Sequence, residues 1–298
     1  MVALVLSGGS IRGSWQAGAI RAVCEAGYMP EYIYGISVGA MNSAFINDRA
    51  GAYYQSLGAV DWYKITDDLI RFWKEKITCP NDLITKRSTV KLIWNILNNK
   101  FDGLVDNAPL RKLVHDTIDI ENLKKSPIHH NVGITNFRNG NIEYCDPQFT
   151  HNFLDCVIAS TSIPVTMPAM IIGDLPYFDG GIRDIAPLSA AIKSGAETII
   201  AILCQPENIS ATTANHRNII QLLERTTDIM CNEIETNDIN ECLWVNDNLD
   251  KMPEKRHINL IVIRPDKDLD IDIQDFGSGE IAQMINAGYE QGKKVLAS

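Results

Sequence analysis

Residues 32–44 read YIYGISVGAMNSA, an apolar run that meets a serine between two glycines and continues into small residues. Tyr32–Ile36 is typical of a buried strand, and the small residues that follow suit a helix packed close against a sheet. In a G-x-S-x-G elbow the chain turns sharply from strand to helix, so Gly35 and Gly39 avoid clashes and the hydroxyl of Ser37 projects beside the helix N-terminus. The pentapeptide alone also fits an ordinary glycine-rich turn, so its surroundings decide its meaning.

A second strand, glycine loop and helix come just before this one. Val2–Leu6 is a short apolar run, and Trp15–Ala26 carries apolar and small residues at helical spacing. Between them residues 7–14 read SGGSIRGS, and the backbone N–H groups of such a loop can converge on negative charge. A P-loop would need Lys where Ser14 stands, and a dinucleotide loop would need an acid at the end of the second strand, where Ser37 stands. An oxyanion hole is therefore the better interpretation of the loop.

The remaining patterns predict an α/β fold of three layers, with a mainly parallel central sheet between helices. Asn-Gly between two extended runs favours a β-hairpin around Arg138-Asn139-Gly140, with strands at Ile128–Thr135 and Asn141–Tyr144. Further strands are predicted at Ala169–Ile172, at Tyr177-Phe178, at Thr198–Leu203 and at Ile258–Ile263, and helices at Leu188–Lys193, Asn218–Glu241 and Gly279–Leu296. This alternation places helices on both faces of the sheet.

We expect one domain over residues 1–298, because this length suits a single large α/β unit. Its core motifs run over about 4–203, and a C-terminal strand and helices occupy about 215–298. Residues 52–123 are predicted to form a helical cap insertion after the nucleophile helix. The apolar side chains of this insertion fit either a core or a lipid-facing surface: Trp62, Ile65, Leu69, Phe72, Trp73, Leu92, Ile93, Trp94 and Leu97.

Composition excludes several classes of protein. No stretch approaches the ~20 uninterrupted apolar residues that span a bilayer, and the N-terminus has no basic segment or cleavage site, so a cytoplasmic location is expected. The formal net charge of -10 argues against a nucleic-acid partner. The seven cysteines form no C-x-x-C pair, so reduced thiols are expected and neither a metal nor a cofactor is. The segment from Lys74 to Lys125 contains ten basic and seven acidic residues, which fits either a solvated surface or a basic patch that contacts lipid.

The third motif is Asp179-Gly180-Gly181, an acid followed by glycines that allow a sharp turn. Together the three blocks resemble the patatin-like phospholipase family, in which a glycine-rich oxyanion loop, a G-x-S-x-G serine and a D-G-[AG] aspartate occur in this order. The block ASTSIP, residues 159–164, is similar to the Ala-Ser-containing, proline-ended block that precedes the aspartate in that family. The resemblance covers the chain from about Leu4 to Leu203. One position departs from it, because Ser10 stands where the family's loop usually has a third glycine.

This resemblance implies a metal-independent serine hydrolase of lipid or lysolipid esters with a Ser-Asp dyad. Ser37 would attack the ester carbonyl, Asp179 would accept its proton, and N–H groups of Gly9 and Ser10 would hold the oxyanion. Free aspartate has a pKa of ~3.9, so this base needs a desolvated position, which Tyr177, Phe178 and Ile182 could supply. The implied site residues are Ser37 and Asp179, the loop residues Gly8, Gly9, Ser10, Arg12 and Gly13, with Arg12 bracing the loop, and the glycines Gly35, Gly39, Gly180 and Gly181. The protein would act in the cytoplasm, with transient contact at membrane surfaces.

Three other functions stay open from the residues alone. An α/β-hydrolase triad could use Ser37, Asp179 and His257, although His257 opens an apolar strand where that fold needs a loop. An acyltransferase or thioesterase-like enzyme would share the strand-elbow-helix logic with a histidine base. A low-turnover lipid-binding regulatory protein would keep the fold. Head-group and acyl-chain preference, oligomeric state and regulation are not encoded in these motifs.

Overall fold

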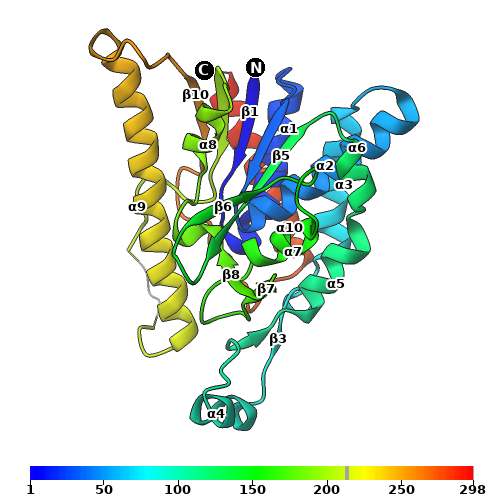
Figure 1. The fold of residues 1–298 in the computed structure, drawn as a ribbon, viewed down its shortest axis with the longest axis vertical. Helices are drawn as coiled ribbons and strands as arrows, with labels where there is room; N and C mark the ends of the chain where they lie inside the picture. Colours follow the sequence, from blue (N-terminus) through cyan, green and yellow to red (C-terminus); the bar gives the residue numbers. More distant parts are fainter. Residues whose placement is uncertain (212–214, 298) are drawn as a thin grey trace.

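The computed structural model describes residues 1–211 and 215–297, and its centre is an eight-stranded sheet flanked by helices on both faces (Figure 1). The strand order is β10-β9-β1-β2-β5-β8-β7, and β6 pairs with β5 beside this path. The strands are β1 (Val2–Leu6), β2 (Tyr32–Gly35), β5 (His129–Asn136), β6 (Ile142–Cys145), β7 (Met170–Ile172), β8 (Leu175–Asp179), β9 (Thr198–Ile202) and β10 (Asn259–Ile263).

The sheet is mixed, and its larger part is parallel as predicted. β10, β9, β1, β2 and β5 run parallel to one another, whereas β8 and β6 run antiparallel to β5, and β7 antiparallel to β8. Gly35 pairs with Val132 of β5, and Asp179 pairs with Ile134 of the same strand. The ends of β2 and β8 therefore meet across β5, and the end of β1 lies beside that of β2.

Helices cover the sheet on both faces (Figure 1). Leu4 and Leu6 of β1 belong to the core shared with α1, α2, α3 and α10, whereas Ala3 and Val5 belong to the core under α8 and α9. This alternation follows the period of two in a strand that is buried on both faces. The helices are α1 (Gly13–Glu25), α2 (Val38–Leu57), α3 (Trp62–Lys76), α4 (Thr89–Leu97), α5 (Ala108–Thr117), α6 (Ile120–Lys125), α7 (Phe153–Ser160), α8 (Leu188–Lys193), α9 (Ile219–Asp247) and α10 (Ser278–Leu296).

The helical segment after α2 contains one feature that the patterns did not predict. α2 continues to Leu57, and α3, α5 and α6 then pack on the body. Between α3 and α5 the chain forms the short strands β3 (Thr85–Lys86) and β4 (Val105–Asp106), which pair with each other and carry α4 between them. Figure 1 shows α4 at the foot of the molecule, away from the central sheet. The buried helix α7 was also not predicted, and its C-terminal end falls in the ASTSIP block.

Glycines allow the C-terminal helix α10 to pack closely against α1. A Cβ atom on Gly18 would lie 1.9 Å from the carbonyl oxygen of Ile285, and one on Gly288 would lie 1.9 Å from that of Trp15. Two helices can approach this closely only where side chains are missing. Within residues 1–211 and 215–297, no helix is long and apolar enough to cross a membrane. The seven cysteines are all free thiols, and six of them are buried.

Candidate active site

The serine elbow forms where β2 ends and α2 begins. Ser37 has φ 55° and ψ -125°, a conformation that L-residues rarely adopt and that occurs at functional turns. A Cβ atom on Gly35 would lie 2.4 Å from the carbonyl oxygen of Gly39, and one on Gly39 would lie 2.2 Å from that of Leu6. Both glycines are therefore needed for α2 to begin this close to β1 and β2. The side chain of Ser37 is placed at the carboxyl edge of the parallel strands.

Asp179 ends β8 on the other side of β5 and is almost fully buried. Its carboxylate accepts a hydrogen bond from the N–H of Gly181 at 2.8 Å, and its own N–H donates to the carbonyl oxygen of Ser162 at 3.0 Å. Burial raises the pKa of Asp179 to about 7, and this rise is partly offset by its hydrogen bonds with the Ser37 side chain and the Gly181 N–H. A carboxyl group in this state can accept a proton near neutral pH.

The two glycines after Asp179 allow the chain to turn inside the core. A Cβ atom on Gly180 would lie 2.5 Å from the carbonyl oxygen of Gly133, and one on Gly181 would lie 2.6 Å from Cδ1 of Ile185 and 3.1 Å from Oδ1 of Asp179. Ile185 is buried and also contacts the loop at Gly8. It therefore packs between the loop at Gly8 and the turn at Gly181 and helps to exclude water there, a role that the sequence did not indicate.

The residues expected to desolvate the aspartate are arranged differently. Phe178 points to the opposite face of β8 from Asp179 and packs edge-on against Phe137. Ile182 is 37% exposed. Tyr177 is buried on the same side of the strand as Asp179, and its hydroxyl donates to Glu143 at 3.0 Å.

The glycine loop between β1 and α1 lies directly beside Ser37. The N–H of Gly8 donates to the carbonyl oxygen of Ile185 at 3.3 Å, and a Cβ atom on Gly8 would come within 3.0 Å of the Ser37 Cβ. A Cβ atom on Gly9 would lie 2.2 Å from that of Cys204. Among the residues described, none accepts the N–H of Gly9 or Ser10. These two donors are available to an oxyanion near Ser37.

A buried polar network ties this loop to α2 and α3. The side-chain amide of Asn42 donates to the carbonyl oxygen of Gly13 at 3.0 Å and to Gln16 at 2.9 Å, and the indole N–H of Trp73 donates to Asn42 at 2.9 Å. Gln16 in turn donates to the carbonyl oxygen of Ser7 at 3.1 Å. Such satisfied networks hold neighbouring segments in one arrangement, here the loop against the elbow helix.

Arg12 is joined to the long helix α9. Its guanidinium makes two hydrogen bonds to the carboxylate of Asp228, at 2.9 and 3.1 Å, and Gln205 donates to the same carboxylate at 2.7 Å. The pair links the short 3-10 turn of the loop, Ser10–Arg12, to α9. Asp228 had no recognisable motif around it, and only the folded chain places it beside the loop.

Ser160 holds the backbone of Ser37. The N–H of Ser37 donates to its hydroxyl oxygen at 2.9 Å, and that hydroxyl donates to the carbonyl oxygen of Gly133 at 2.7 Å. The sequence identifies the block that contains Ser160 only by its resemblance to the family and indicates no role for this residue. The structure shows that it bridges the elbow and β5.

An open pocket begins at Ser37, with a cavity volume of about 40 Å³ and about 430 Å³ of space when its open mouth is included. Most of its walls are apolar and come from segments throughout the chain. It is lined by Ser10, Ser37, Val38, Met41, Trp73, Leu83, Leu110, Thr161, Ile163, Met167 and Ile273. An apolar pocket with a few polar groups at one end is typical of a site for a small apolar ligand.

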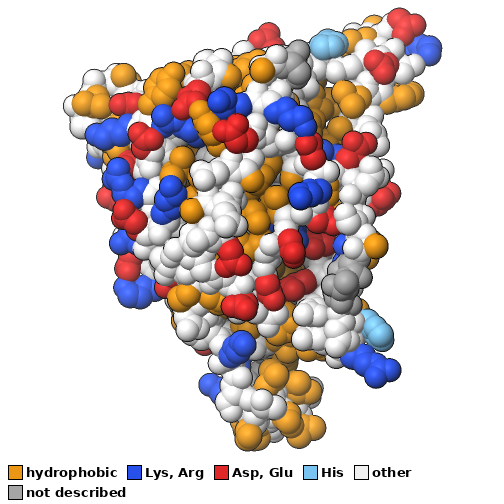
Figure 2. Space-filling view, turned by 180° about the vertical axis from the view of Figure 1, so that it is seen from behind, with side chains coloured by type: hydrophobic (Ala, Val, Ile, Leu, Met, Phe, Trp, Pro, Cys, Tyr) orange, Lys and Arg blue, Asp and Glu red, His pale blue; other side chains and the backbone are white. Residues whose placement is uncertain are grey.

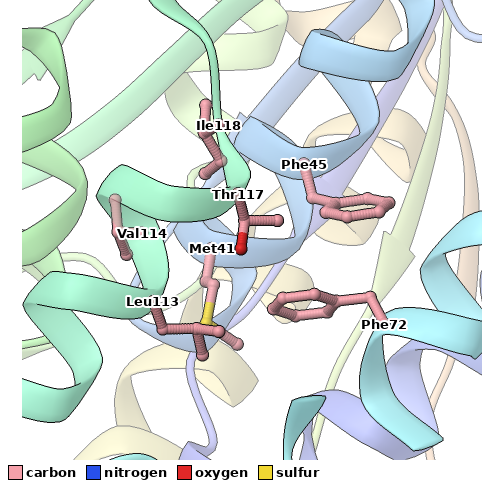
Figure 3. A pocket seen from close by; sticks show the side chains of 7 residues that line it. All are labelled: Met41, Phe45, Phe72, Leu113, Val114, Thr117 and Ile118. Atoms are coloured by element: carbon pink, nitrogen blue, oxygen red, sulfur yellow. The ribbon is translucent and has the colours of Figure 1, made fainter. Parts of the chain in front are cut away.

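A second, tightly packed apolar hollow, with no space large enough for a water molecule, lies beyond Met41, which lines both spaces. Figure 3 shows its side chains projecting from α2, α3 and α5 toward one another. Its lining is Met41, Phe45, Phe72, Leu113, Val114, Thr117 and Ile118. Met41 therefore separates the pocket at Ser37 from this hollow.

The histidines lie elsewhere. His257 is exposed and precedes β10, so it stands at the edge of the parallel sheet opposite to Ser37. His130 is buried, contacts the hydroxyl of Ser43 at 2.9 Å, and has a pKa lowered by burial to about 3. Its neighbour His129 stacks on Tyr32, so the two rings face opposite sides of β5 as expected. No cluster of three or more potential metal ligands is found in the described part of the chain.

Ser10 adopts φ 55°, the left-handed region that favours glycine. We therefore expect Ser10→Gly to raise the free energy of unfolding by about 1 kcal/mol, because the steric cost of this conformation disappears. Denaturant unfolding of the two proteins measures the difference. A less stable Ser10→Gly protein would show that the Ser10 side chain makes a compensating contact.

A family model described as patatin-like phospholipase matches residues 4–192. Among solved structures, VipD from Legionella pneumophila is similar, with 15% sequence identity, a TM-score of 0.44, and coverage of 99% of this chain and 66% of that chain. The present chain thus spans slightly less than two thirds of the VipD chain. A search of curated proteins finds no significant match.

Proposed function

The chain belongs to the patatin-like phospholipase family, which implies lipid acyl hydrolase activity, and on this premise we propose that it cleaves lipid esters with Ser37 as nucleophile and Asp179 as base. The proposal rests on the pairing of Ser37 with Asp179. A serine on a glycine elbow stands beside a buried carboxyl group whose pKa is raised to about 7. Among the residues that the structure describes, no histidine lines the pocket at Ser37, which favours the carboxylate of Asp179 as the base.

The proposed reaction follows from these positions. The Ser37 hydroxyl attacks the ester carbonyl while Asp179 takes its proton, and the N–H groups of Gly9 and Ser10 stabilise the negative oxygen. The intermediate then expels the alcohol, which leaves with the proton from Asp179. A water molecule next gives its proton to Asp179 and attacks the acyl-serine. The fatty acid departs, and the proton returns to Ser37.

The pocket supports a lipid acyl chain as the group bound. Beyond Ser37 its walls are almost entirely apolar, which suits a hydrocarbon chain. None of the described residues that line it is charged, so they favour an apolar group over a charged one. Trp73, Leu83 and Leu110 come from residues 52–123, so we assign this insertion to covering the acyl site. Ile273 comes from the C-terminal segment, and we therefore treat residues 1–298 as one catalytic domain.

A fluorophosphonate probe and a lipid extract together test this function. We expect the probe to form a covalent adduct on Ser37, and mass spectrometry of a total lipid extract to show fatty acids released by the wild type and none released by Ser37→Ala. The lipids consumed identify the substrate. Transfer of the acyl group to an added alcohol in place of water would indicate an acyltransferase. Absence of both labelling and turnover in the wild type would point to a lipid-binding protein and refute the proposal.

Met41 is expected to limit the length of the acyl chain that the pocket accepts. Met41→Ala removes the side chain that stands between the pocket at Ser37 and the apolar hollow behind it, so longer chains gain space and apolar contacts. We expect the ratio of kcat/KM for a sixteen-carbon ester to that for an eight-carbon ester to rise about tenfold. Met167→Ala is the matched control, because Met167 lines only the first pocket. An equal change in both variants would contradict a specific role for Met41.

A further inference from the structure

The chain carries a projecting element, residues 85–106, that is called the arm below. Its base is the antiparallel pair β3 and β4, in which Thr85 faces Asp106 and Lys86 faces Val105. α4 forms its tip and extends away from the rest of the molecule (Figure 1). Asn95 is the one buried residue of this helix, so α4 contributes little to the core.

The outer face of α4 is apolar and exposed. Val90, Ile93, Trp94 and Leu97 stand at positions i, i+3, i+4 and i+7, which places them on one stripe of the helix. Their side chains are 79%, 53%, 54% and 77% exposed, respectively. Figure 2 shows this tip as a cluster of hydrophobic side chains at the foot of the molecule. Apolar residues at this spacing usually face a protein core. On α4 they face solvent, which is typical of an interaction surface.

The charge around this stripe is opposite to that of the protein. The arm contains four basic residues, Lys86, Arg87, Lys91 and Lys100, and two acidic ones near its base, Asp102 and Asp106, in a chain of net charge -10. Arg87 holds the arm itself, because it donates to the carbonyl oxygen of Val105 and to Asp102, both at 3.2 Å. The three lysines are exposed, and the ammonium group of Lys100 lies 5.5 Å from the ring centre of Trp94.

The base of the arm is part of the rim of the pocket at Ser37. Leu83 precedes β3 and Leu110 follows β4, and both side chains line that pocket. The N–H of Leu110 donates to the carbonyl oxygen of Leu83 at 3.2 Å. The N–H of Val105 donates to the carbonyl oxygen of Thr166 at 2.9 Å, which ties the arm to the segment that carries Met167. The base of the arm is therefore joined to the wall of the pocket, while its tip extends away from it.

We propose that the arm docks the protein on an anionic lipid bilayer, with the stripe of α4 among the acyl chains and the exposed lysines at the head groups. A short amphipathic helix with aromatic and aliphatic residues on one side and lysines around it matches this environment. The positive charge of the arm complements an anionic surface, from which the rest of this acidic protein is repelled. Delivery of lipid to Ser37 in this way rests on the proposed function, whereas docking itself does not.

Vesicle binding tests the docking without any need for turnover. In Ser37→Ala protein, co-sedimentation is measured with vesicles of phosphatidylcholine alone and with vesicles that also contain phosphatidylserine. We expect binding to the anionic vesicles, and a loss of at least about 100-fold in Ile93→Asp/Leu97→Asp. Phe149→Asp is the matched control, since Phe149 is 88% exposed and lies outside the arm, and its binding is expected to be unchanged. Replacement of Lys86, Lys91 and Lys100 by Gln is expected to reduce the preference for anionic vesicles by about 100-fold.

Three outcomes would overturn the docking proposal. In the first, the wild-type protein binds neither kind of vesicle, and in the second, Ile93→Asp/Leu97→Asp still binds as the wild type does. In the third, ultracentrifugation shows a wild-type dimer that this variant no longer forms, which would assign the apolar face of α4 to contact with a second copy of the chain. A soluble short-chain ester separates docking from catalysis. We expect the α4 variants to hydrolyse it at the wild-type rate while their rate on anionic vesicles falls. A wild type that binds vesicles but cleaves no ester would refute the proposed function and leave the docking intact.

Discussion

Asp179→Asn is expected to lower kcat/KM for a lipid ester by about 10³-fold while the protein stays folded, because the change removes the proposed proton acceptor and keeps the shape of the side chain. Asparagine can still accept the N–H of Gly181, which donates to the Asp179 carboxylate at 2.8 Å. Steady-state kinetics with a soluble ester measures the loss. Asp174→Asn is the matched control, because Asp174 is an exposed acid in the β7–β8 turn, and this variant is expected to keep full activity. Full activity in Asp179→Asn would exclude the dyad.

The pH dependence of wild-type kcat/KM gives an independent measurement of the pKa of Asp179. Since burial raises the pKa of Asp179 to about 7, the carboxylate needed as base is mostly protonated below pH 6. We expect kcat/KM to rise with pH through a midpoint near about 7 and then to level off. A midpoint near about 4 would mean that Asp179 is solvated in the working enzyme.

The raised pKa of Asp179 also has a cost in stability. The folded protein holds this proton up to about pH 7, whereas the unfolded chain loses it near 3.8. The stabilising contribution of the protonated group is thus complete below the unfolded pKa and is lost as the pH rises through the folded one. Relative to the wild type, Asp179→Asn should gain stability with rising pH, by up to about 4 kcal/mol above pH 8. Thermal unfolding at pH 4 and pH 8 would detect this difference.

Local sequence was sufficient to predict the elbow, the loop and the aspartate turn. Each depends on neighbours in the chain, since Gly35 and Gly39 flank Ser37, and Gly180 follows Asp179. The contacts that hold these pieces together were not predictable. Ser160 lies 123 residues from Ser37 in the sequence. Asp228 lies 216 residues from Arg12. Serine and aspartate are common, and only tertiary packing distinguishes these two from the others.

In the helical insertion, too, the sequence pattern could not predict which apolar residues are buried. Periodicity indicates that one face of a helix is apolar, but it does not reveal what covers that face. Trp62, Ile65 and Leu69 of α3 are buried in the core, whereas Ile93 and Leu97 of α4 are exposed, although the two helices have similar patterns. The difference arises from the β3–β4 pair, which carries α4 beyond the reach of the core.

Gly39→Ala is expected to damage both stability and catalysis, because the new methyl group would meet backbone atoms that cannot move away. Its Cβ would lie 2.2 Å from the carbonyl oxygen of Leu6 and 2.8 Å from that of Ser7. α2 would have to shift away from β1 and carry Ser37 with it. We expect the free energy of unfolding to fall by about 3 kcal/mol and kcat/KM to fall at least about 100-fold. Denaturant unfolding and ester kinetics on the same preparation measure the two effects.

Gly279→Ala is the control that isolates the clash from the mere loss of a glycine. Gly279 lies in the first turn of α10, and no atom stands within 4 Å of the Cβ it would gain. Alanine there is expected to be neutral or to stabilise the protein by up to about 1 kcal/mol, because it favours the helix, with no change in activity. If Gly39→Ala behaved like Gly279→Ala, α2 would not pack against the end of β1 as closely as the elbow requires. The nucleophile would then need a different support from the one described.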